Sequence, residues 1–332
     1  MVAASLDMSL FFGTPEQKKE FSSQLLQNLK TRGVVKIRNH SVPESDISRL
    51  FELTRQFFAL SHEEKMHAKH PPHSSPSRGY SYVGQENISS ISGFDKGLSS
   101  GGNVRDLKEI YDIGSKDGTA APNQWIKETS LPGFRSFMES FYATCFQTEL
   151  QLLEALEVAL DMPATSLTDI HLTAQNEFRL LHYPAIPTSE LRDGTATRIA
   201  EHTDFGSITM LFQDSTGGLQ VENQEQLGCF HDVSTESQNE IILNIGDSLQ
   251  RLTNDTFRAA CHRVTYPPSI KADDEEIIPE RFSVAYFAKV DRDAFITPRK
   301  EFISDAKPCK YEAMTAGEFG NMRFAKLLGG RS

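Results

Sequence analysis

One set of candidate metal ligands constrains the fold of this 332-residue chain more than any other feature. His202 and Asp204 stand two residues apart, and His262 follows Asp204 by 58 residues. A turn marked by Gly206 allows the first two side chains to converge on one point. His262 can join them only if a distant strand, which we expect at residues 259–264, lies beside the segment that ends at His202. The chain must therefore bring remote strands together around one ion.

The residue types in this set indicate the kind of metal chemistry. Two histidines and one carboxylate are the protein ligands of the facial triad in mononuclear non-haem Fe(II) oxygenases, and this triad leaves coordination positions open. Thiolate ligands would favour other metals. We predict that His202, Asp204 and His262 bind the metal and are the catalytic residues. Because a His-x-Asp pair with a later histidine is common by chance, this prediction needs a second motif.

The second motif is a strand predicted at residues 281–287. Side chains alternate between the two faces of a strand. One face carries Arg281, Ser283, Ala285 and Phe287, and the other carries Phe282, Val284 and Tyr286. A guanidinium binds a carboxylate through two parallel hydrogen bonds, and a serine hydroxyl can add a third. The first face therefore predicts a site for an anionic ligand beside an apolar neighbour.

Many more blocks follow one another in an order that resembles a known family. The chain is similar to the 2-oxoglutarate/Fe(II)-dependent dioxygenase superfamily, in the branch that includes isopenicillin N synthase and plant flavonoid and gibberellin oxidases. The matching blocks are residues 32–43, 57–60, 63–65, 78–80, 106–109, 202–207, 217–221, 244–247, 249–250, 253–255, 262–264 and 281–283. So many blocks in one order argue against similarity by chance.

The resemblance implies an α+β fold with a mainly β core. This core is a double-stranded β-helix, or jelly roll, with N-terminal and flanking helices. It further implies that Fe(II) is the cofactor, and that 2-oxoglutarate and O2 are cosubstrates. The far carboxylate of 2-oxoglutarate would meet Arg281, Ser283 and Tyr183. Tyr183 precedes a proline as in the family, although the chain has Leu181-His182 where members often have Asn-Tyr.

The reaction implied by the resemblance oxidises an unactivated C–H bond while 2-oxoglutarate is decarboxylated to succinate and CO2. Hydroxylation is the expected outcome, but desaturation, cyclisation and epoxidation use the same site. Two alternatives stay open. An isopenicillin N synthase-type oxidase would not use 2-oxoglutarate and would bind a carboxylate of its substrate at Arg281 and Ser283. A non-enzymatic binding protein on the same fold is the other, although the complete ligand set counts against it.

Several residues are candidates for substrate contact. Arg179 shares a strand face with Tyr183, since it stands four positions before it, and a surface salt bridge is its alternative role. The other candidates are aromatic or apolar, namely Phe205, Leu211, Phe287, Tyr80 and Tyr111. For the two tyrosines a place on the surface or in a minor core is at least equally expected. These residues suit a small, fairly hydrophobic substrate. A specialised metabolite is the leading expectation, and a nucleobase or amino-acid derivative stays open.

Periodicity and turn residues predict the elements around these motifs. We expect helices at residues 15–29, 44–60 and 132–160, because apolar residues recur at helical spacing. We expect strands at residues 34–37, 177–184, 207–212, 219–222 and 240–245, with a hairpin turn at Gly217-Gly218. Residues 1–332 should form a single oxygenase domain. Within it, residues 1–130 form an N-terminal helical and lid part, with a mobile insertion at residues 89–102, and residues 131–332 form a long support helix plus the jelly-roll core.

The amino-acid composition indicates which binding partners and which cell compartment to expect. The net charge is −11, from 34 basic and 45 acidic residues, which disfavours nucleic acid or an anionic membrane surface as a partner. The four cysteines show no CxxC pairing, as expected for free thiols in a reducing compartment. No signal peptide or membrane-spanning run is evident. We therefore expect a cytoplasmic protein that acts on a small molecule, with no obligate protein partner evident.

Overall fold

The computed structural model describes residues 4–72, 77–86, 88, 104–117, 121–173, 175–192, 194–271 and 275–327. The strands are β1 (Ser5–Asp7), β2 (Val34–Arg38), β3 (Gly79–Ser81), β4 (Arg105–Asp106), β5 (Glu109–Ile113), β6 (Glu177–Tyr183), β7 (Ile186–Pro187), β8 (Ala196–Thr197), β9 (Ile199–His202), β10 (Ile208–Gln213), β11 (Leu219–Glu222), β12 (Phe230–Asp232), β13 (Ile241–Ile245), β14 (His262–Val264), β15 (Ile277–Ile278) and β16 (Arg281–Phe287). The α-helices are α1 (Pro15–Arg32), α2 (Glu44–Ala59), α3 (His62–Met66), α5 (Phe134–Ala159), α6 (Ser189–Arg192), α7 (Asp247–Leu252) and α8 (Ala316–Leu327).

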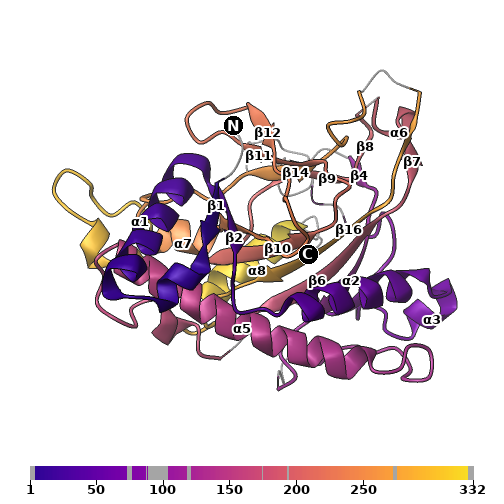
Figure 1. The fold of residues 1–332 in the computed structure, drawn as a ribbon, viewed down its shortest axis with the longest axis horizontal. Helices are drawn as coiled ribbons and strands as arrows, with labels where there is room; N and C mark the ends of the chain where they lie inside the picture. Colours follow the sequence, from indigo (N-terminus) through magenta and orange to yellow (C-terminus); the bar gives the residue numbers. More distant parts are fainter. Residues whose placement is uncertain are drawn as a thin grey trace.

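Most of the strands build a large and a small sheet that face each other (Figure 1), while β7 pairs with β15 and β4 with β8 outside them. The large sheet has eight strands in the order β1-β2-β13-β10-β16-β6-β5-β3, and the small sheet has four in the order β12-β11-β14-β9. Apart from the parallel pair β1 and β2, the pairs within these two sheets are antiparallel. This arrangement confirms the predicted jelly-roll core with flanking helices.

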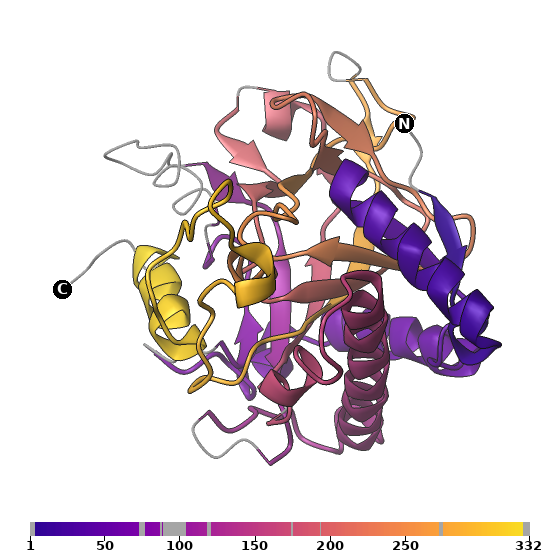
Figure 2. The ribbon, with the colours of Figure 1, turned by 90° about the vertical axis from the view of Figure 1, so that its left-hand side faces the viewer.

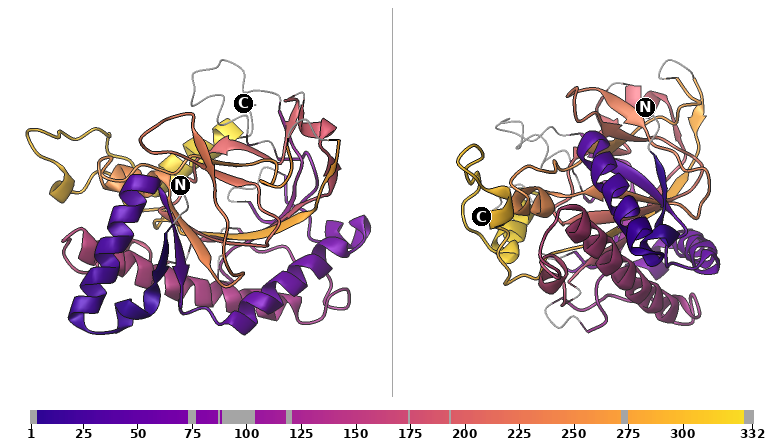
Figure 3. Two further views of the ribbon diagram at one scale, coloured as in Figure 1. Left: turned by 45° about the horizontal axis from the view of Figure 1, so that its top comes forward. Right: turned by 60° about the vertical axis from the view of Figure 1, so that its left-hand side comes forward.

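Helices cover the outer side of the large sheet. Figure 3 shows α2 and α5 lying under its strands, and Figure 2 shows the length of α5 beside them. Phe141 of α5 packs 5.6 Å, between ring centroids, from both Phe178 of β6 and Phe212 of β10. The other face of the sheet packs against the small sheet through a second buried cluster that includes Leu181 and Val264. The candidate site lies in that second layer, between the sheets.

The start of α1 shows how the sequence sets an element boundary. Thr14 is the N-cap, and its hydroxyl accepts a hydrogen bond from the backbone N–H of Gln17, whose side chain accepts one from the N–H of Thr14. Pro15 occupies the first turn, where no N–H is needed. Gly33 ends the helix in the left-handed conformation, with φ of 70°. The helix runs three residues beyond the predicted end at residue 29, up to this cap.

The predicted hairpin at Gly217-Gly218 is wrong. The strands on either side, β10 and β11, lie in different sheets. Both glycines have positive φ, 83° and 89°, so they do turn the chain, but they carry it from the large sheet to the small one. A Cβ on Gly218 would lie 2.5 Å from the carbonyl oxygen of Thr265, so a close backbone approach also requires glycine there. The strand expected at residues 259–264 is limited to β14.

We propose that the chain is one domain, as expected, because strands from its N-terminal part lie in the large sheet. β2 pairs with β13, and β5 pairs with β6, so the large sheet joins the first 130 residues to the rest. The insertion predicted at residues 89–102 lies outside the described residues. Among the described residues, no helix is both long enough and apolar enough to cross a membrane.

Candidate active site

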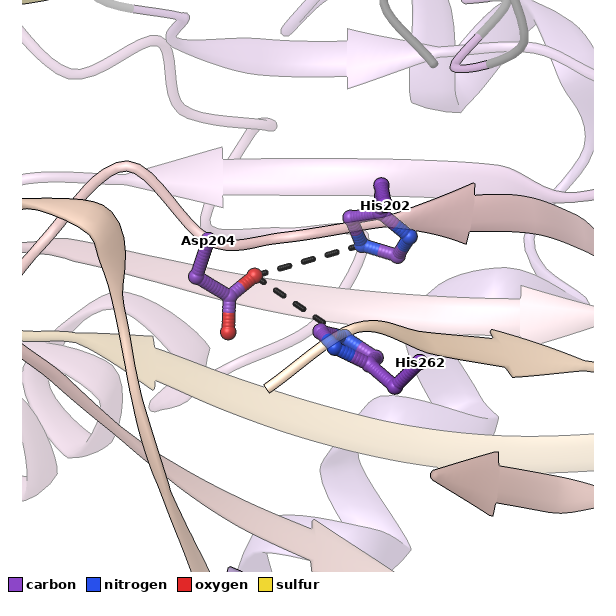
Figure 4. Close-up of side chains that lie close together, drawn as sticks. All are labelled: His202, Asp204 and His262. Atoms are coloured by element: carbon purple, nitrogen blue, oxygen red, sulfur yellow. Dashed lines mark ion pairs between the residues drawn. The ribbon is translucent and has the colours of Figure 1, made fainter. Parts of the chain in front are cut away.

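His202, Asp204 and His262 meet at one point between the two sheets (Figure 4). His202 ends β9 and His262 begins β14, and the two residues are direct partners across this antiparallel pair. The ligand atoms of the three side chains lie within 4.8 Å of one another. Asp204 Oδ1 is 3.9 Å from Nε2 of each histidine. The distant strand required by the sequence is therefore β14.

Backbone carbonyls orient both imidazoles. Nδ1 of His202 lies 2.8 Å from the carbonyl oxygen of Ala200, and Nδ1 of His262 lies 2.9 Å from that of Ala260. A carbonyl only accepts hydrogen bonds, so Nδ1 carries the proton and Nε2 presents its lone pair. Burial, with the nearby His262, lowers the pKa of His202 to about 3, which keeps this imidazole neutral. Neutral imidazole is the form that binds a metal ion.

Two neutral side chains orient the carboxylate. Oδ2 of Asp204 accepts hydrogen bonds from the hydroxyl of Thr209 at 2.6 Å and from the amide of Asn244 at 2.9 Å. Oδ1 remains directed at the two imidazoles. Burial tends to raise the pKa of Asp204, but His262, His202 and the two hydrogen bonds outweigh burial, and the pKa is lowered. The site thus combines an ionised carboxylate with the neutral imidazole of His202.

The start of α7 holds the loop that carries Asp204. Backbone N–H groups of Asp247 and Ser248 donate to the carbonyl oxygens of Asp204 at 2.7 Å and of Gly206 at 3.0 Å. A Cβ on Gly246 would lie 2.3 Å from the carbonyl oxygen of Gly206. Only glycine allows the backbone at residue 246 to lie this close to Gly206. This contact gives a physical reason for the glycine in the family-like segment 244–247.

The anion-binding motif lies at another part of the same cavity. Arg281 begins β16, is 1% exposed, and lines the cavity with Ser283 and Tyr183. Its guanidinium donates to the Ser283 hydroxyl at 3.0 Å and to Oε1 of Gln213 at 2.9 Å. No carboxylate of a described residue forms an ion pair with it. A buried cation without a counter-ion is costly, so this end of the cavity favours an anionic ligand.

Arg179 lies elsewhere on the cavity wall and is saturated by carboxylates. Asp112 accepts from its Nε at 2.7 Å and Nη2 at 3.0 Å, and Glu86 accepts from its Nη1 at 3.0 Å and Nη2 at 3.2 Å. Lys108 also binds Glu86, at 3.1 Å. Burial tends to raise the pKa of Glu86, but Arg179 and Lys108 outweigh burial and lower it to about 2. Arg179 is therefore part of a buried ion network, and the predicted surface salt bridge is not what the structure shows.

The structure brings most of the predicted site residues to one cavity. Its lining includes His202, Asp204, His262, Arg281, Ser283, Tyr183, Arg179, Phe205, Leu211 and Phe287. Tyr80 and Tyr111 are not in this lining, so their predicted substrate contact is withdrawn. Tyr80 is 2% exposed and donates to Glu109, and Tyr111 is fully buried with its ring 4.5 Å from that of Phe57. Both tyrosines belong to the core under the helices.

Sequence reasoning missed the residues that support the site. Thr209, Asn244 and Gln213 orient Asp204 and Arg281, and Glu86 holds Arg179. Asn244 does belong to a block that resembles the family, so that block was a usable signal. Thr209 and Gln213 share alternate positions of β10 with Leu211, a pattern that also points into the cavity.

The comparisons with known proteins agree with this geometry. The family model described as the 2OG-Fe(II) oxygenase superfamily matches residues 171–290, and that of the non-haem dioxygenase N-terminal region (in morphine synthesis) matches residues 5–128. The chain is 42% identical to the 2-oxoglutarate-dependent dioxygenase gloF of Glarea lozoyensis, covering 98% of this chain and 99% of the relative. It is 41% identical to the proline hydroxylase buaE of Petromyces alliaceus, covering 97% and 98%.

A solved structure shares the fold over nearly the whole chain. A full-length Neurospora crassa protein in complex with alpha-KG and thymine has a TM-score of 0.84 and 31% identity, covering 97% of this chain and 96% of that one. The chain belongs to the 2OG-Fe(II) oxygenase superfamily. It is a 2-oxoglutarate-dependent dioxygenase, with Fe(II) as its metal and 2-oxoglutarate and O2 as cosubstrates. The relatives' names favour this function over the oxidase and the non-enzymatic alternatives.

Proposed function

We propose that Nε2 of His202, Oδ1 of Asp204 and Nε2 of His262 bind the Fe(II) of this oxygenase. The observation that carries the proposal is the convergence of these three atoms in one cavity with the uncompensated guanidinium of Arg281. Their chemistry fits Fe(II), because neutral imidazole and ionised carboxylate suit this ion. Oδ1 of Asp204 accepts no hydrogen bond from another described residue, so it can serve as a ligand.

The same proposal places the far carboxylate of 2-oxoglutarate at Arg281, Ser283 and Tyr183. Two guanidinium donors already bind neutral acceptors, Ser283 and Gln213, which fix the orientation of the fork. Its Nε has no partner among the described residues. A carboxylate at this position would supply the missing negative charge.

When bound, Fe(II) and O2 supply the oxidation of a substrate C–H bond that is coupled to decarboxylation of 2-oxoglutarate to succinate and CO2. The side chains position the reactants. Asn244 and Thr209 hold the carboxylate of Asp204, and the carbonyls of Ala200 and Ala260 hold the imidazoles. Positioning the target C–H bond then decides the outcome, which we propose is hydroxylation.

The walls of the cavity define a mixed substrate site. Phe205, Leu211 and Phe287 offer apolar surface, and they remain our proposed substrate contacts. Arg179 and Glu86 add a polar patch, with the Arg179 guanidinium 6.0 Å from the centre of the Phe287 ring. Because two carboxylates saturate Arg179, this patch is a poor receptor for an anionic group. Glu86 already accepts from Arg179 and Lys108, but an ionised carboxylate has lone pairs for a further donor, so this patch favours a substrate group that donates a hydrogen bond.

We therefore propose a small nitrogen-containing metabolite, with an N–H group, as the substrate. Two relatives support this class by their printed names, since one is a proline hydroxylase and another is bound to thymine. Both compounds are small rings with N–H groups. A specialised metabolite of the same chemistry fits equally, so a role in specialised metabolism stays part of the proposal.

Matched pairs of compounds test this substrate class. The Fe(II)-loaded oxygenase is incubated with 2-oxoglutarate and thymine, L-proline or 2-pyrrolidinone, and then with their N-methylated partners, while succinate is measured. We expect at least one N–H compound to raise succinate formation and its N-methylated partner to fail. Equal stimulation by both members of the active pairs would contradict the proposed role of the N–H group.

We also propose that the enzyme works in the cytoplasm without nucleic acid, a membrane or an obligate protein partner. The net charge of −11 supports the first two points, because like charges repel polyanionic partners. Cys145, Cys229, Cys261 and Cys309 are free thiols, which supports a reducing compartment. Cell fractionation with an antibody to the chain would test the location.

A further inference from the structure

A second buried arginine lies next to the anion-binding end of the cavity. Arg198 directly precedes β9, which carries His202, and its side chain is 0% exposed. Its Nη2 donates to the carbonyl oxygens of Pro279 and, at 3.4 Å, of Pro184. Its Nε and Nη1 have no hydrogen-bond partner among the described residues. Buried N–H groups without a partner are rare and costly, so this arrangement needs a reason.

Tyr183 connects Arg198 to the anchor proposed for 2-oxoglutarate. The guanidinium carbon of Arg281 lies 5.0 Å from the centre of the Tyr183 ring, and that of Arg198 lies 6.0 Å from the same centre. Burial, and next the charge of Arg281, lower the pKa of Arg198 to about 10, so the guanidinium still carries its charge near neutral pH. Two cations thus flank one tyrosine at the same end of the site.

No carboxylate in the described part of the chain pairs with either arginine. Asp214 is the acidic group whose charge acts on Arg198. Its two oxygens accept from the backbone N–H groups of Phe282 at 2.6 Å and Thr216 at 2.9 Å. Asp214 therefore stabilises a turn and forms no ion pair with Arg198. The two buried positive charges remain together without an anion.

We propose that Arg198 is a second cation for the far carboxylate of 2-oxoglutarate, acting behind Arg281 and Tyr183 rather than through direct contact with the metal. Its charge raises the affinity for a ligand with an anionic tail, and its ring contact steadies Tyr183. The inference rests on the proposed role of Arg281 as the anchor. It adds a positioning residue that lies outside the Arg-x-Ser motif.

The test compares two ligands that share a metal-binding 2-oxo acid head. 2-Oxoglutarate has a tail carboxylate, and 2-oxopentanoate has a methyl group in its place. Each is titrated without oxygen into the Fe(II)-loaded protein, and affinity is read from the visible charge-transfer band. We expect Arg198→Met to weaken the binding of 2-oxoglutarate about 10- to 50-fold, which is the scale of one nearby but indirect charge, and to leave that of 2-oxopentanoate within about threefold.

Three further variants separate the possible causes. Arg198→Lys keeps the charge, so it should retain most of the preference for 2-oxoglutarate. Arg299→Met is a matched control, because Arg299 also donates to a backbone carbonyl, that of Ser166, but is not one of the described arginines that lie over the Tyr183 ring. It should change neither affinity. Arg281→Met should reduce the preference for the tail carboxylate more than Arg198→Met does.

The outcomes distinguish this inference from the proposal on which it rests. An unchanged ligand preference in Arg198→Met, with loss of preference in Arg281→Met, would overturn only the role of Arg198. A normal preference in Arg281→Met would overturn the anchor itself. If Arg198→Met does not fold, Arg198→Gln gives the same comparison. If neither Arg198→Met nor Arg198→Gln folds, the folded Arg198→Lys variant decides. Loss of its preference for 2-oxoglutarate over 2-oxopentanoate would mean that Arg198 only supports the fold, and would overturn the inference.

Discussion

At the scale of single residues, the metal site depends on which atom of each side chain is left free. Backbone carbonyls bind Nδ1 of His202 and His262, and neutral side chains bind Oδ2 of Asp204. The atoms that remain are Nε2, Nε2 and Oδ1. The role of these three residues as metal ligands could be predicted from the sequence. The saturation of Arg179 could not, because its carboxylate partners Asp112 and Glu86 are 67 and 93 residues away along the chain.

His262→Ala should abolish stable Fe(II) binding and turnover, because it removes one of three ligands. Metal content after anaerobic loading and gel filtration measures the first effect, and succinate formation measures the second. His231→Ala is the matched control, since His231 lies on β12 and contacts Asn223 outside the cavity lining. Full iron occupancy in the His262 variant would remove His262 from the ligand set.

Asn244→Ala should weaken Fe(II) binding about 10- to 100-fold without unfolding the protein, because the hydrogen bond to Asp204 Oδ2 orients that ligand. Thr209→Val should act in the same direction. Calorimetric titration with Mn(II), which does not oxidise readily, gives the affinity of each variant. Wild-type affinity in both variants would show that Asp204 needs no such support.

At the scale of elements, close backbone contacts join the loop of Asp204 to α7, and a buried polar cluster joins α5 to the large sheet. Alternation along residues 281–287 correctly predicted which side of β16 faces the cavity, because a strand with one polar face has a clear period. The crossing at Gly217-Gly218 was predicted as a hairpin, because two glycines with positive φ suit a tight turn and a change of sheet equally well. The strands with which β10 and β11 pair decide between a hairpin and a change of sheet, and these partners lie far away along the chain.

Gly246→Ala should destabilise the protein by about 2 kcal/mol or more and weaken metal binding, because its Cβ would lie 2.3 Å from the carbonyl oxygen of Gly206. Gly320→Ala is the matched control within α8. A Cβ there meets nothing within 4 Å, so the change should be neutral or stabilise the protein by up to about 1 kcal/mol. Urea unfolding of both variants measures the difference, and equal stabilities would contradict the close-contact explanation.

Glu149 of α5 should make stability depend on pH. It is fully buried, and its carboxyl group contacts Asn176 at 2.6 Å and Tyr286 at 3.0 Å. Burial raises its pKa well above the ordinary value, so the folded protein keeps a proton that the unfolded chain loses above about pH 4.5. The contribution of Glu149 to stability is therefore fully present below that pH and falls as the pH rises toward the folded pKa.

Glu149→Gln should remove this dependence, because glutamine keeps hydrogen-bonding groups but does not ionise. Thermal unfolding at pH 5 and pH 8 should show that the stability of the variant relative to the wild type is greater at pH 8 than at pH 5. Glu149→Leu is the contrasting change, and it should cost about 1–3 kcal/mol, because it removes the carboxyl oxygen that accepts from both Asn176 and Tyr286, although Asn176 still donates to the Tyr286 hydroxyl. A wild-type pH profile in Glu149→Gln would rule out the raised pKa.

At the scale of the whole molecule, the fold brings residues 198–204, 262 and 281–283 together between two sheets. The family resemblance predicted the jelly roll and its helices, since its blocks span most of the chain. Local sequence did not predict that strands from the N-terminal part complete the large sheet, because β2 pairs with β13 across some 200 residues, as Val34 does with Asn244. Nor did it decide whether Tyr80 and Tyr111 contact substrate or lie in the core, because tertiary packing determines their burial.

The most direct test of the proposed site is an anaerobic titration of the Fe(II)-loaded protein with 2-oxoglutarate, followed through the visible metal-to-ligand charge-transfer band. We predict a saturable band in the wild type, at least a tenfold loss of 2-oxoglutarate affinity in Arg281→Met, which is about 1.4 kcal/mol, and no band in His262→Ala. A saturable band that is unchanged in Arg281→Met, or bound iron that gives no band, would contradict the proposed site.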